Sequence, residues 1–277
     1  MPQTPCPIYN SRRIWLIGGT SESALIAEAL AHETELSCII TVTTEAAKKL
    51  YPKNPLLEVW VGKLDIENIG KFLQEQQIAA ILDASHPHAA EISKLAIATA
   101  AQYQIPYLRY ERPPAIPPSP NPGKTNENII QIDSFETLVA GDFLTQQRVL
   151  LTIGYRFLSL FRPWQEKATL FARILPSLTA LEAALNAGFT SDRLIAIRPP
   201  ISIELERALW QQWQISMVVT KASGKAGGED IKRVLAAELG KSLIIIKRPP
   251  VKYPKQTSNI ADVLEFLKGP CISNFLR

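Results

Sequence analysis

The chain has 277 residues and a mass of 30.7 kDa, which is long for one ordinary domain and suits two domains of about 100–150 residues each. Hydrophobic residues make up 46% and charged residues 20% of the chain, which excludes disorder as the dominant state. The net charge of +4 comes from the second half: residues 1–112 hold 10 Lys and Arg against 12 Asp and Glu, whereas residues 113–277 hold 20 against 14.

Short β-rich runs alternate with helical stretches in the first half of the chain. Continuous apolar runs predict strands that are buried on both faces, and apolar residues three and four positions apart predict helices. This alternation is typical of a parallel sheet with helices on both sides. The expected strands are Arg13–Gly18, Leu36–Val42, Leu57–Val61, Ile78–Asp83 and Pro106–Arg109, and the expected helices are Ser21–Ala31, Glu45–Leu50, Ile66–Gln76 and His88–Tyr103.

Six prolines in residues 113–122 exclude an interior helix or a central strand and predict a stiff linker. The same alternation resumes after it. We therefore expect an N-terminal Rossmann-like domain over residues 1–112, a proline-rich linker over 113–125 and a basic C-terminal α/β domain over 126–277, with a ligand cleft between the two domains. The expected strands of the second half are Arg148–Ile153, Ala168–Leu175, Leu194–Ile197, Ile215–Thr220 and Leu243–Ile246, and the expected helices are Ser134–Leu144, Leu178–Ala187, Ile201–Trp213, Gly228–Leu239 and Ile260–Leu267.

The distribution of apolar residues and cysteines indicates a cytoplasmic protein. No apolar run approaches the roughly 18 residues of a membrane span, and the first ten residues lack the basic start of a secretory signal. The three cysteines are far apart and have neither disulfide nor metal-ligand spacing, which suits a reducing compartment. With only three histidines in the chain, no metal site is expected.

The first predicted strand runs directly into the turn Gly18–Ser23, which precedes a helix. Backbone amides at such a helix N-terminus bind anions, and glycines allow a ligand to approach the backbone closely. Thr20, Ser21 or Ser23 could cap the helix or bind a phosphate. The turn lacks the G-x-G-x-x-G pattern, so a plain glycine turn with a serine cap is the alternative.

Polar residues also follow the second and fourth predicted strands. After the second strand, Thr44, Lys48 and Lys49 suit the 2′-phosphate of NADP, whereas Glu45 suits the ribose of NAD. After the fourth strand, residues 83–88 read Asp-Ala-Ser-His-Pro-His and should lie beside the Gly18–Ser23 turn. The alternative is that Asp83 and Ser85 only cap the next helix.

Two further segments could bind anionic groups. Arg109 and Arg112 flank the entrance to the linker and could hold carboxylates, unless they form an internal ion pair with Glu111. Residues 220–228 form a second glycine-rich turn between a strand and a helix, which lacks the order of a P-loop and therefore disfavours a kinase or an ATPase. A basic second half suits a nucleic acid, a polycarboxylate or a phosphate compound, or simply a solvated surface.

Taken in order, six motifs resemble the precorrin-6A reductase family of cobalamin biosynthesis. They are GGTSES at residue 18, DASHPHA at residue 83, LRYERP at residue 108, LLTIGYRFL at residue 150, VVTKASGKAGGEDIKRVLAAELG at residue 218 and IIIKRPP at residue 244. The resemblance implies two Rossmann-like domains and the reduction of one ring double bond of precorrin-6A, or its cobalt form, to precorrin-6B, with NADPH or NADH as cofactor.

The resemblance also implies which residues contact the ligands. No metal ligands are expected, and the expected substrate is a tetrapyrrole polycarboxylate rather than a nucleic acid or a membrane. The side-chain type and the placement of His86 make it a candidate proton donor, although water or a lysine would serve as well. Neighbouring enzymes of corrin synthesis are further candidate partners. The expected cofactor-binding residues are Gly18, Gly19, Thr20, Ser21, Glu22, Thr44, Asp83, Ser85 and His86, and the expected substrate-binding residues are Arg109, Tyr110, Arg112, Lys221, Ser223, Gly224, Gly227, Gly228 and Lys232.

Two other classes of protein have a similar organisation. One is another two-domain enzyme that uses a nucleotide, such as a glycosyltransferase, although no acid pair for sugar chemistry is evident. The other is a two-domain protein that closes on an anion without catalysis. Tight binding of NADPH or NADH separates the reductase from both.

Overall fold

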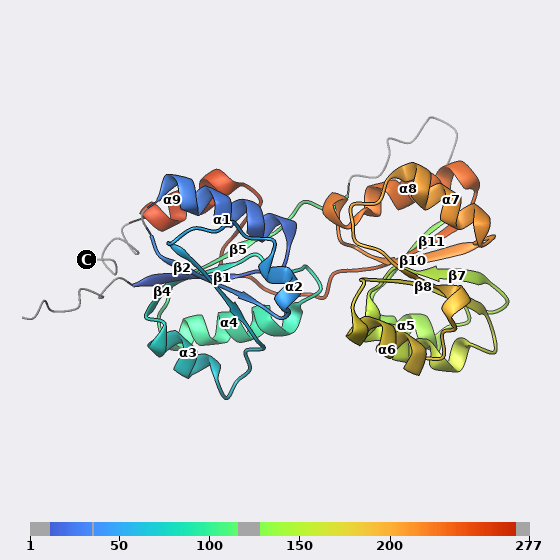
Figure 1. Cartoon of the computed structure of the whole chain (residues 1–277), viewed down its shortest axis with the longest axis horizontal. Coiled ribbons are helices and arrows are strands. Elements are labelled where there is room, and N and C mark those ends of the chain that lie inside the picture. Colours follow the sequence, from blue (N-terminus) through green and yellow to red (C-terminus); the bar gives the residue numbers. More distant parts are fainter. Residues whose placement is uncertain (1–11, 35, 116–127, 270–277) are drawn as a thin grey trace, which may run out of the picture. The chain divides into compact units, whose positions relative to one another are not determined.

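The computed structural model describes residues 12–34, 36–115 and 128–269, and its chain divides into two compact units (Figure 1). Unit 1 comprises the described residues of 1–112 and of 250–277, and unit 2 comprises those of 113–249. Each unit contains a parallel sheet of six strands between layers of helices, which confirms the predicted α/β class. The predicted ligand cleft between the two domains stays a prediction.

The strands of unit 1 form a sheet in the order β12-β5-β4-β1-β2-β3. Every pair of neighbours in this sheet is parallel. The strands are β1 (Arg13–Ile17), β2 (Cys38–Val42), β3 (Leu57–Val61), β4 (Ile78–Asp83), β5 (Tyr107–Tyr110) and β12 (Gln256–Thr257), and the helices are α1 (Ser21–Glu33), α2 (Glu45–Lys48), α3 (Ile69–Glu75), α4 (Ala90–Gln102) and α9 (Ile260–Lys268).

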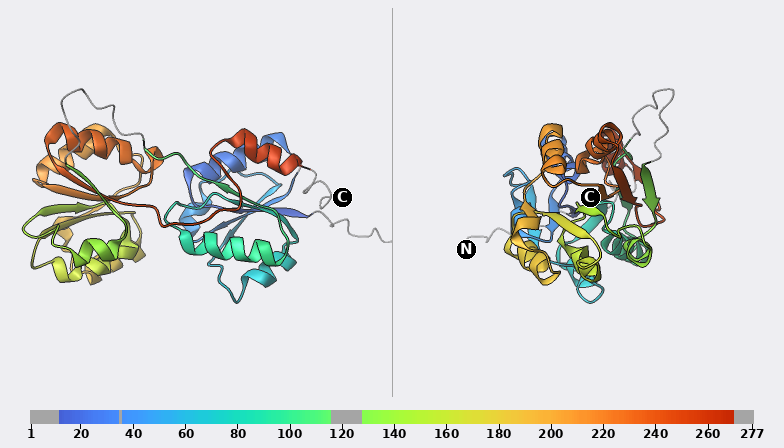
Figure 2. Two further views of the ribbon diagram at one scale, coloured as in Figure 1. Left: turned by 180° about the vertical axis from the view of Figure 1, so that it is seen from behind. Right: turned by 90° about the vertical axis from the view of Figure 1, so that its right-hand side faces the viewer.

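Strand β1 shows why the central strands are apolar throughout. Successive side chains point to opposite faces of a sheet, so Ile14 and Leu16 join the core under α1 and α9, whereas Trp15 and Ile17 join the core under α3 and α4. Figure 2 shows these two helix layers from behind. Because helices cover both faces of the sheet, a polar side chain in this strand would be buried whichever face it pointed to.

Unit 2 repeats this architecture with the strand order β6-β11-β10-β7-β8-β9, again parallel throughout. The strands are β6 (Ile129–Ile132), β7 (Arg148–Leu151), β8 (Thr169–Ile174), β9 (Leu194–Ala196), β10 (Met217–Lys221) and β11 (Ser242–Ile246); the α-helices are α5 (Phe135–Ala140), α6 (Leu178–Asn186), α7 (Ile203–Gln212) and α8 (Glu229–Leu239); and the 3₁₀ helices are η1 (Tyr155–Trp164), η2 (Ser191–Arg193) and η3 (Lys225–Gly227).

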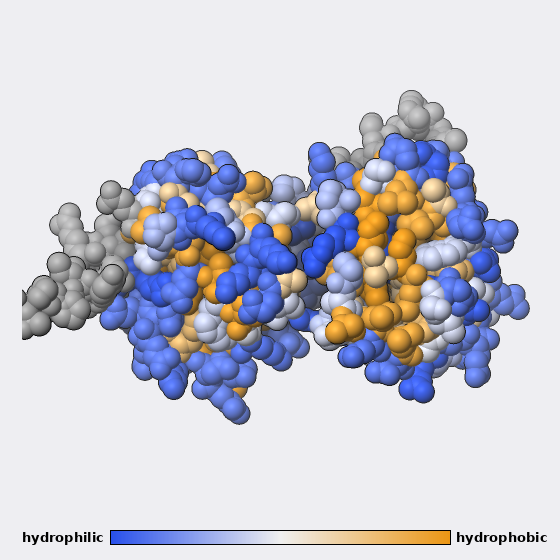
Figure 3. Space-filling view, in the orientation of Figure 1, coloured by the Kyte–Doolittle hydropathy of each residue, from blue (hydrophilic) through white to orange (hydrophobic). Residues whose placement is uncertain are grey.

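One face of the unit 2 sheet packs against α7 and α8, and the other packs against α5, α6 and η1. Helix α6 turns Ala180 and Ala184 toward the core, where their small side chains allow the helix to lie close to the sheet. Its leucines at 178, 181 and 185 are exposed, and Figure 3 shows more apolar surface on unit 2 than on unit 1 in that view.

The last part of the chain differs from the predicted domain boundary. The segment after residue 249 was expected in the C-terminal domain, but β12 pairs with β5, and Val263, Leu264 and Leu267 of α9 pack into the core beside α1. A two-residue polar strand has no pattern of its own, so its place is set by β5. Most of the predicted linker, residues 116–125, lies outside the described residues.

Four other elements have no counterpart among the predictions from sequence: β6, η1 and the short helices η2 and η3. Strand β6 is four residues long and lies at the edge of its sheet, and η1 contains Pro163, which is unusual inside a helix. Within the described residues, no helix is both long enough and apolar enough to span a membrane.

Candidate functional site

The strand order of unit 1 reverses between β1 and β4. Strands β2 and β3 follow on one side of β1, whereas β4 and β5 lie on its other side. Sheets of this kind bind ligands at such a reversal, beyond the carboxyl ends of the strands. The turn after β1 and the polar segment after β4 meet there, where Thr20 Oγ1 donates a hydrogen bond of 2.8 Å to the carbonyl of Ala84. The predicted proximity of these two segments is confirmed.

The start of helix α1 is closed by a reciprocal cap. Thr20 Oγ1 accepts from the amide of Ser23, and Ser23 Oγ accepts from the amide of Thr20. This arrangement satisfies two of the amides that a helix start leaves unpaired. Ser21 and Glu22 lie between these two residues, and among the described residues no hydrogen-bond acceptor is found for their amides.

Tyr51, which sequence reasoning missed, completes the turn. Its hydroxyl accepts a 2.7 Å hydrogen bond from the amide of Gly19 and lies 2.8 Å from Ser23 Oγ. A Cβ on Gly18 would lie 2.2 Å from this hydroxyl, so glycine is needed at 18 because Tyr51 packs against it. Burial raises the pKa of Tyr51, which keeps the hydroxyl protonated at neutral pH.

We expect Tyr51→Phe to raise the Kd for the nicotinamide cofactor several-fold. The Gly19 amide loses its acceptor, at a cost of about 1 kcal/mol, and the turn loses the group that orients it. Fluorescence titration with NADH and NADPH measures the change, with Tyr103→Phe, which alters a tyrosine beyond α4, as the matched control. An unchanged or lower Kd would instead mean that the cofactor displaces Tyr51 from the Gly19 amide.

The turn fits the pyrophosphate of a nicotinamide dinucleotide in two respects. The amides of Ser21 and Glu22 are available at the N-terminus of a helix of 13 residues, where the helix dipole favours negative charge. Gly19 has φ +92°, and nothing lies within 4 Å of where its Cβ would stand, so the turn is open on that side. A bound pyrophosphate would be held by these amides and would need no bond from Gly19 itself.

Two further predicted cofactor residues lie at the same end of the sheet. Thr44 caps the short helix α2 after β2 and is exposed, as are Glu45, Lys48 and Lys49. His86 is partly buried in the segment after β4, where its Nδ1 accepts a 3.1 Å hydrogen bond from the amide of His88. Contact of either Thr44 or His86 with a cofactor stays a prediction.

Arg109 lies in a buried ion pair, not on the surface. Its guanidinium donates to Asp83 Oδ1 at 2.8 Å, to Ser85 Oγ at 3.0 Å and to Glu111 Oε2 at 2.8 Å, and Arg109 and Asp83 are only 1% and 0% exposed. Although burial alone would lower it, the pKa of Arg109 is raised by the two carboxylates. The predicted alternative of an internal pair with Glu111 is therefore what the structure contains.

The second arginine of this segment also has an acidic partner. Arg112 Nη2 lies 2.6 Å from Glu22 Oε2, so a predicted substrate residue and a predicted cofactor residue are joined across the start of α1. Tyr110 lies close by, and its pKa is raised by burial and by Glu22. Both arginines are therefore paired with carboxylates of unit 1 at this end of the sheet. A substrate carboxylate would have to compete with Glu22 for Arg112.

In unit 2 the strand order reverses between β7 and β10. Thr152, the first residue after β7, bonds to strand β10: its amide and its Oγ1 both donate to the carbonyl of Val219, at 2.9 and 3.1 Å. Lys221 ends β10 at this point and is half-buried. The predicted substrate residues are thus divided between the two units, with Arg109, Tyr110 and Arg112 in unit 1 and the others in unit 2.

The glycine-rich turn after β10 already holds an acidic side chain. Glu229, the first residue of α8, accepts 2.9 Å hydrogen bonds from the amide of Gly224 and from Arg233 Nε. Gly227 packs against Ser223, whose Oγ would lie 1.9 Å from a Cβ at 227, and Gly228 has φ +68°. The glycines are therefore explained by the turn itself, and its contact with an external anion stays a prediction.

Lys232 supports this turn from inside the protein. The side chain is buried, with 2% of the residue exposed, and its Nζ donates to the carbonyls of Gly227 and Gly228 at 3.2 and 3.0 Å. Burial and the nearby Arg173 lower its pKa to about 8. Because both hydrogen bonds go to carbonyls of the turn, Lys232 stabilises the conformation of the turn in this structure.

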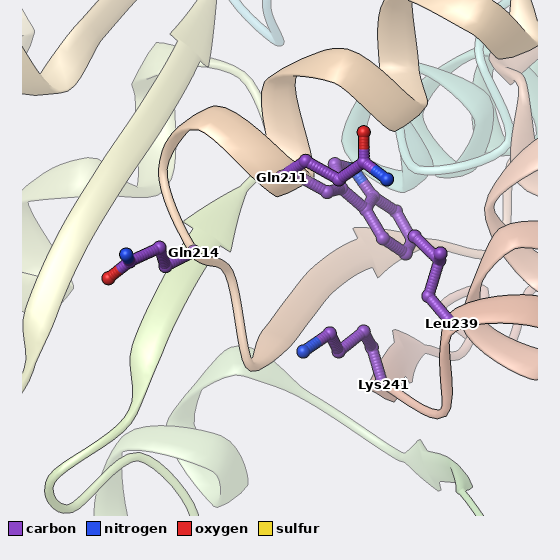
Figure 4. A pocket seen from close by; sticks show the side chains of 5 residues that line it. Gln211, Gln214, Leu239 and Lys241 are labelled. Carbon is purple, nitrogen blue, oxygen red and sulfur yellow. The ribbon is translucent and has the colours of Figure 1, made fainter.

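A pocket of about 400 Å³ opens at the other end of the unit 2 sheet, near the start of β11 (Figure 4). The lining comes from the ends of α7 and α8 and from the loops that follow them. It is far in the sheet from the carboxyl ends that carry the predicted site. The lining residues are Trp210, Gln211, Gln214, Leu239 and Lys241.

Comparison with known proteins gives consistent matches over most of the chain. It is 47% identical over 256 residues to the cobalt-precorrin-6A reductase of Synechocystis sp., which covers 91% of this chain and 95% of the relative. It is 34% identical over 260 residues to the cobalt-precorrin-6A reductase of Priestia megaterium, covering 92% and 97%. The solved structure of the precorrin-6A reductase CobK has the same fold, with a TM-score of 0.76, 22% identity and coverage of 93% and 96%.

The family match spans both units. Residues 13–268 match the family described as precorrin-6x reductase CbiJ/CobK, from the first residue of β1 to the last residue of α9. The resemblance seen in the six sequence motifs is thereby confirmed. The chain belongs to the precorrin-6x reductase family.

Proposed function

We propose that this protein reduces one ring double bond of cobalt-precorrin-6A with a hydride from NADPH or NADH, in the synthesis of the corrin ring. Membership of the reductase family supports this reaction, and the two relatives compared above are named for the cobalt form of the substrate. The observation in the structure that supports it best is the open turn after β1, where the Ser21 and Glu22 amides start a long helix at the strand reversal of unit 1.

In this proposal the cofactor supplies the hydride, and the protein supplies binding, orientation and charge. The first turn of α1 holds the pyrophosphate, with Tyr51 fixing the shape of the turn. The segment after β4 is held in place by a buried network in which Arg109 donates hydrogen bonds to Asp83 and Ser85. In this proposal the tetrapyrrole carboxylates are held by basic residues, for which Lys221 is a candidate.

The choice between the two cofactors depends on the segment after β2. Exposed Thr44, Lys48 and Lys49 offer a hydroxyl and two positive charges to the 2′-phosphate of NADPH. Exposed Glu45 offers a carboxylate to the free 2′-hydroxyl of NADH. The same segment therefore has groups for either cofactor.

An anaerobic assay with four combinations tests the function: cobalt-loaded and metal-free precorrin-6A, each with NADH and with NADPH. We expect oxidation of the nicotinamide, seen as loss of absorbance at its reduced band, with cobalt-precorrin-6A as the better substrate. Failure of all four, with no binding of either nicotinamide in titrations, would favour the glycosyltransferase-like or anion-binding alternative.

A further inference from the structure

The edge strand β9 lacks the polar residues that the other sheet edges carry. Within the described residues, the two sheets end at β12 and β3 in unit 1 and at β6 and β9 in unit 2. Strand β12 consists of Gln256 and Thr257, β3 contains Glu58 and β6 contains Gln131, whereas β9 reads Leu-Ile-Ala. Polar and charged side chains on an edge strand oppose its pairing with a further strand. Strand β9 is therefore the edge that is open to such pairing.

The backbone of β9 offers hydrogen-bonding groups to a further strand. Successive residues of a strand bond alternately to one side and to the other. The Ile197 amide donates to the Ile174 carbonyl of β8 at 3.0 Å, so Ile195 also faces β8. The amide and carbonyl of Ala196 and the carbonyl of Leu194 therefore point away from the sheet. Ala196 is exposed and Leu194 is partly exposed.

Exposed leucines continue this apolar edge onto α6. Leu178, Leu181 and Leu185 lie three and four positions apart, and therefore on one side of the helix, with exposed fractions of 79%, 41% and 49%. Ala183 and Asn186 line a pocket with residues of η1, so this leucine stripe lies on the opposite side of α6, toward β9. Figure 3 shows an apolar patch on the side of unit 2 that faces the viewer. Contiguous apolar surface of this kind marks an interaction site.

Strand β9 is complementary to a second copy of itself. If two copies pair antiparallel about Ile195, each Ala196 lies opposite Leu194 of the second copy, so the outward-facing backbone groups meet. Each Ala196 amide then donates to the Leu194 carbonyl of the second copy. Pro199 has no amide, and it ends the possible pairing soon after β9.

The same register brings opposite charges together. Asp192 and Arg198 each lie three residues from Ile195, so Asp192 of one copy is placed opposite Arg198 of the other. Both side chains are exposed, and within the described residues Arg198 has no acidic partner. Opposite charges across an antiparallel pair are favourable, whereas like charges there are not. This complementarity favours a second copy over an unrelated partner.

We propose that the protein forms a homodimer in which two copies of β9 pair antiparallel about Ile195 and the two leucine stripes lie on the same face of the joined sheets. A twofold axis perpendicular to the sheet relates the copies, so both α6 helices cover one face. A stable dimer buries about 800 Å² of each copy, which is more than two short strands provide. The leucine stripes therefore supply most of the apolar contact.

Sedimentation at protein concentrations from about 0.1 to 100 μM tests the dimer, because standard interfaces have Kd values of micromolar or lower. We expect the parental protein to be dimeric in this range. Leu178→Glu should raise the dimer Kd about tenfold or more, because it places two carboxylates in an apolar contact. The fold should tolerate this change, since Leu178 is 79% exposed. Leu25→Glu on α1 of unit 1, where Leu25 is 53% exposed, is the matched control and should leave the Kd parental.

Charge exchange tests the register. Asp192→Arg and Arg198→Asp each place like charges opposite one another twice in the dimer, and each should raise the Kd about tenfold. The double variant exchanges the charges and should return the Kd to within about threefold of the parental value. On the unaltered protein, hydrogen exchange of the amide of Ala196 should be slower above the Kd than below it.

The outcomes are distinct. A parental protein that is monomeric at every concentration overturns the proposal and leaves the surface to a different protein. A dimer that Leu178→Glu does not weaken, or whose Ala196 amide exchanges at the monomer rate, places the interface elsewhere and also overturns it. A double variant no tighter than the two single variants overturns the register about Ile195.

Discussion

Replacing Arg109 with methionine is expected to lower the free energy of unfolding of unit 1 by about 3–5 kcal/mol, the usual cost of leaving a buried charge without its partner. Methionine fills a similar volume, so the loss is mainly electrostatic. Among the described residues, the Asp83 carboxylate would keep only the Tyr107 hydroxyl, at 2.7 Å, and the Ser85 amide, at 3.0 Å. Hydrogen exchange at the amides of β1 and β4 measures the change for this unit alone, since two units can unfold separately.

Two further variants identify the cause. Arg207→Met removes a partly exposed arginine paired with Glu238 and is expected to change hydrogen exchange and the denaturation midpoint only slightly. The double variant Arg109→Met with Asp83→Asn should recover part of the loss, because the orphaned carboxylate is then neutral. A single variant as stable as the parent would show that the pair does not hold the end of the sheet.

The fold could be predicted to the extent that each element has its own pattern. Strands such as β4 and β10 are apolar runs buried on both faces, and helices such as α4 have apolar residues three and four positions apart. Such patterns locate an element to within a few residues. Strand β12 and the return of α9 to unit 1 depend on partners more than 140 residues away in the chain. Local composition contains no information about which sheet such a short strand will join.

The candidate site shows the same division between local and distant information. The glycine turn after β1 and the polar segment after β4 were predicted to be neighbours, because strand ends in a parallel sheet meet at one edge. Tyr51 was missed, because it reaches Gly19 from 32 residues away and no motif marks it. Arg109 was placed among the substrate ligands, since the sequence shows Glu111 nearby but not that Asp83 lies 2.8 Å from the guanidinium.

A second large effect is expected at Gly19, where alanine should raise the Kd for NADPH or NADH by about thirtyfold. The estimate corresponds to roughly 2 kcal/mol, the scale of losing a charge-assisted hydrogen bond. At φ +92° an L-residue is strained by about 1–2 kcal/mol and tends to rotate the turn away from the helix amides. The new methyl group would also stand in the open space beside the turn, where the proposed position of the cofactor puts its pyrophosphate.

Gly240 supplies the control that separates strain from contact with the cofactor. It has φ +61°, nothing lies within 4 Å of its Cβ position, and it caps the end of α8 in unit 2. Gly240→Ala should therefore cost a similar amount of stability while the Kd for the cofactor stays parental. If both variants weaken binding equally, the loss comes from general strain, and if neither does, the pyrophosphate is held elsewhere than at the start of α1. Only a change confined to Gly19→Ala would agree with the proposed position of the cofactor, because only this glycine borders the amides of Ser21 and Glu22.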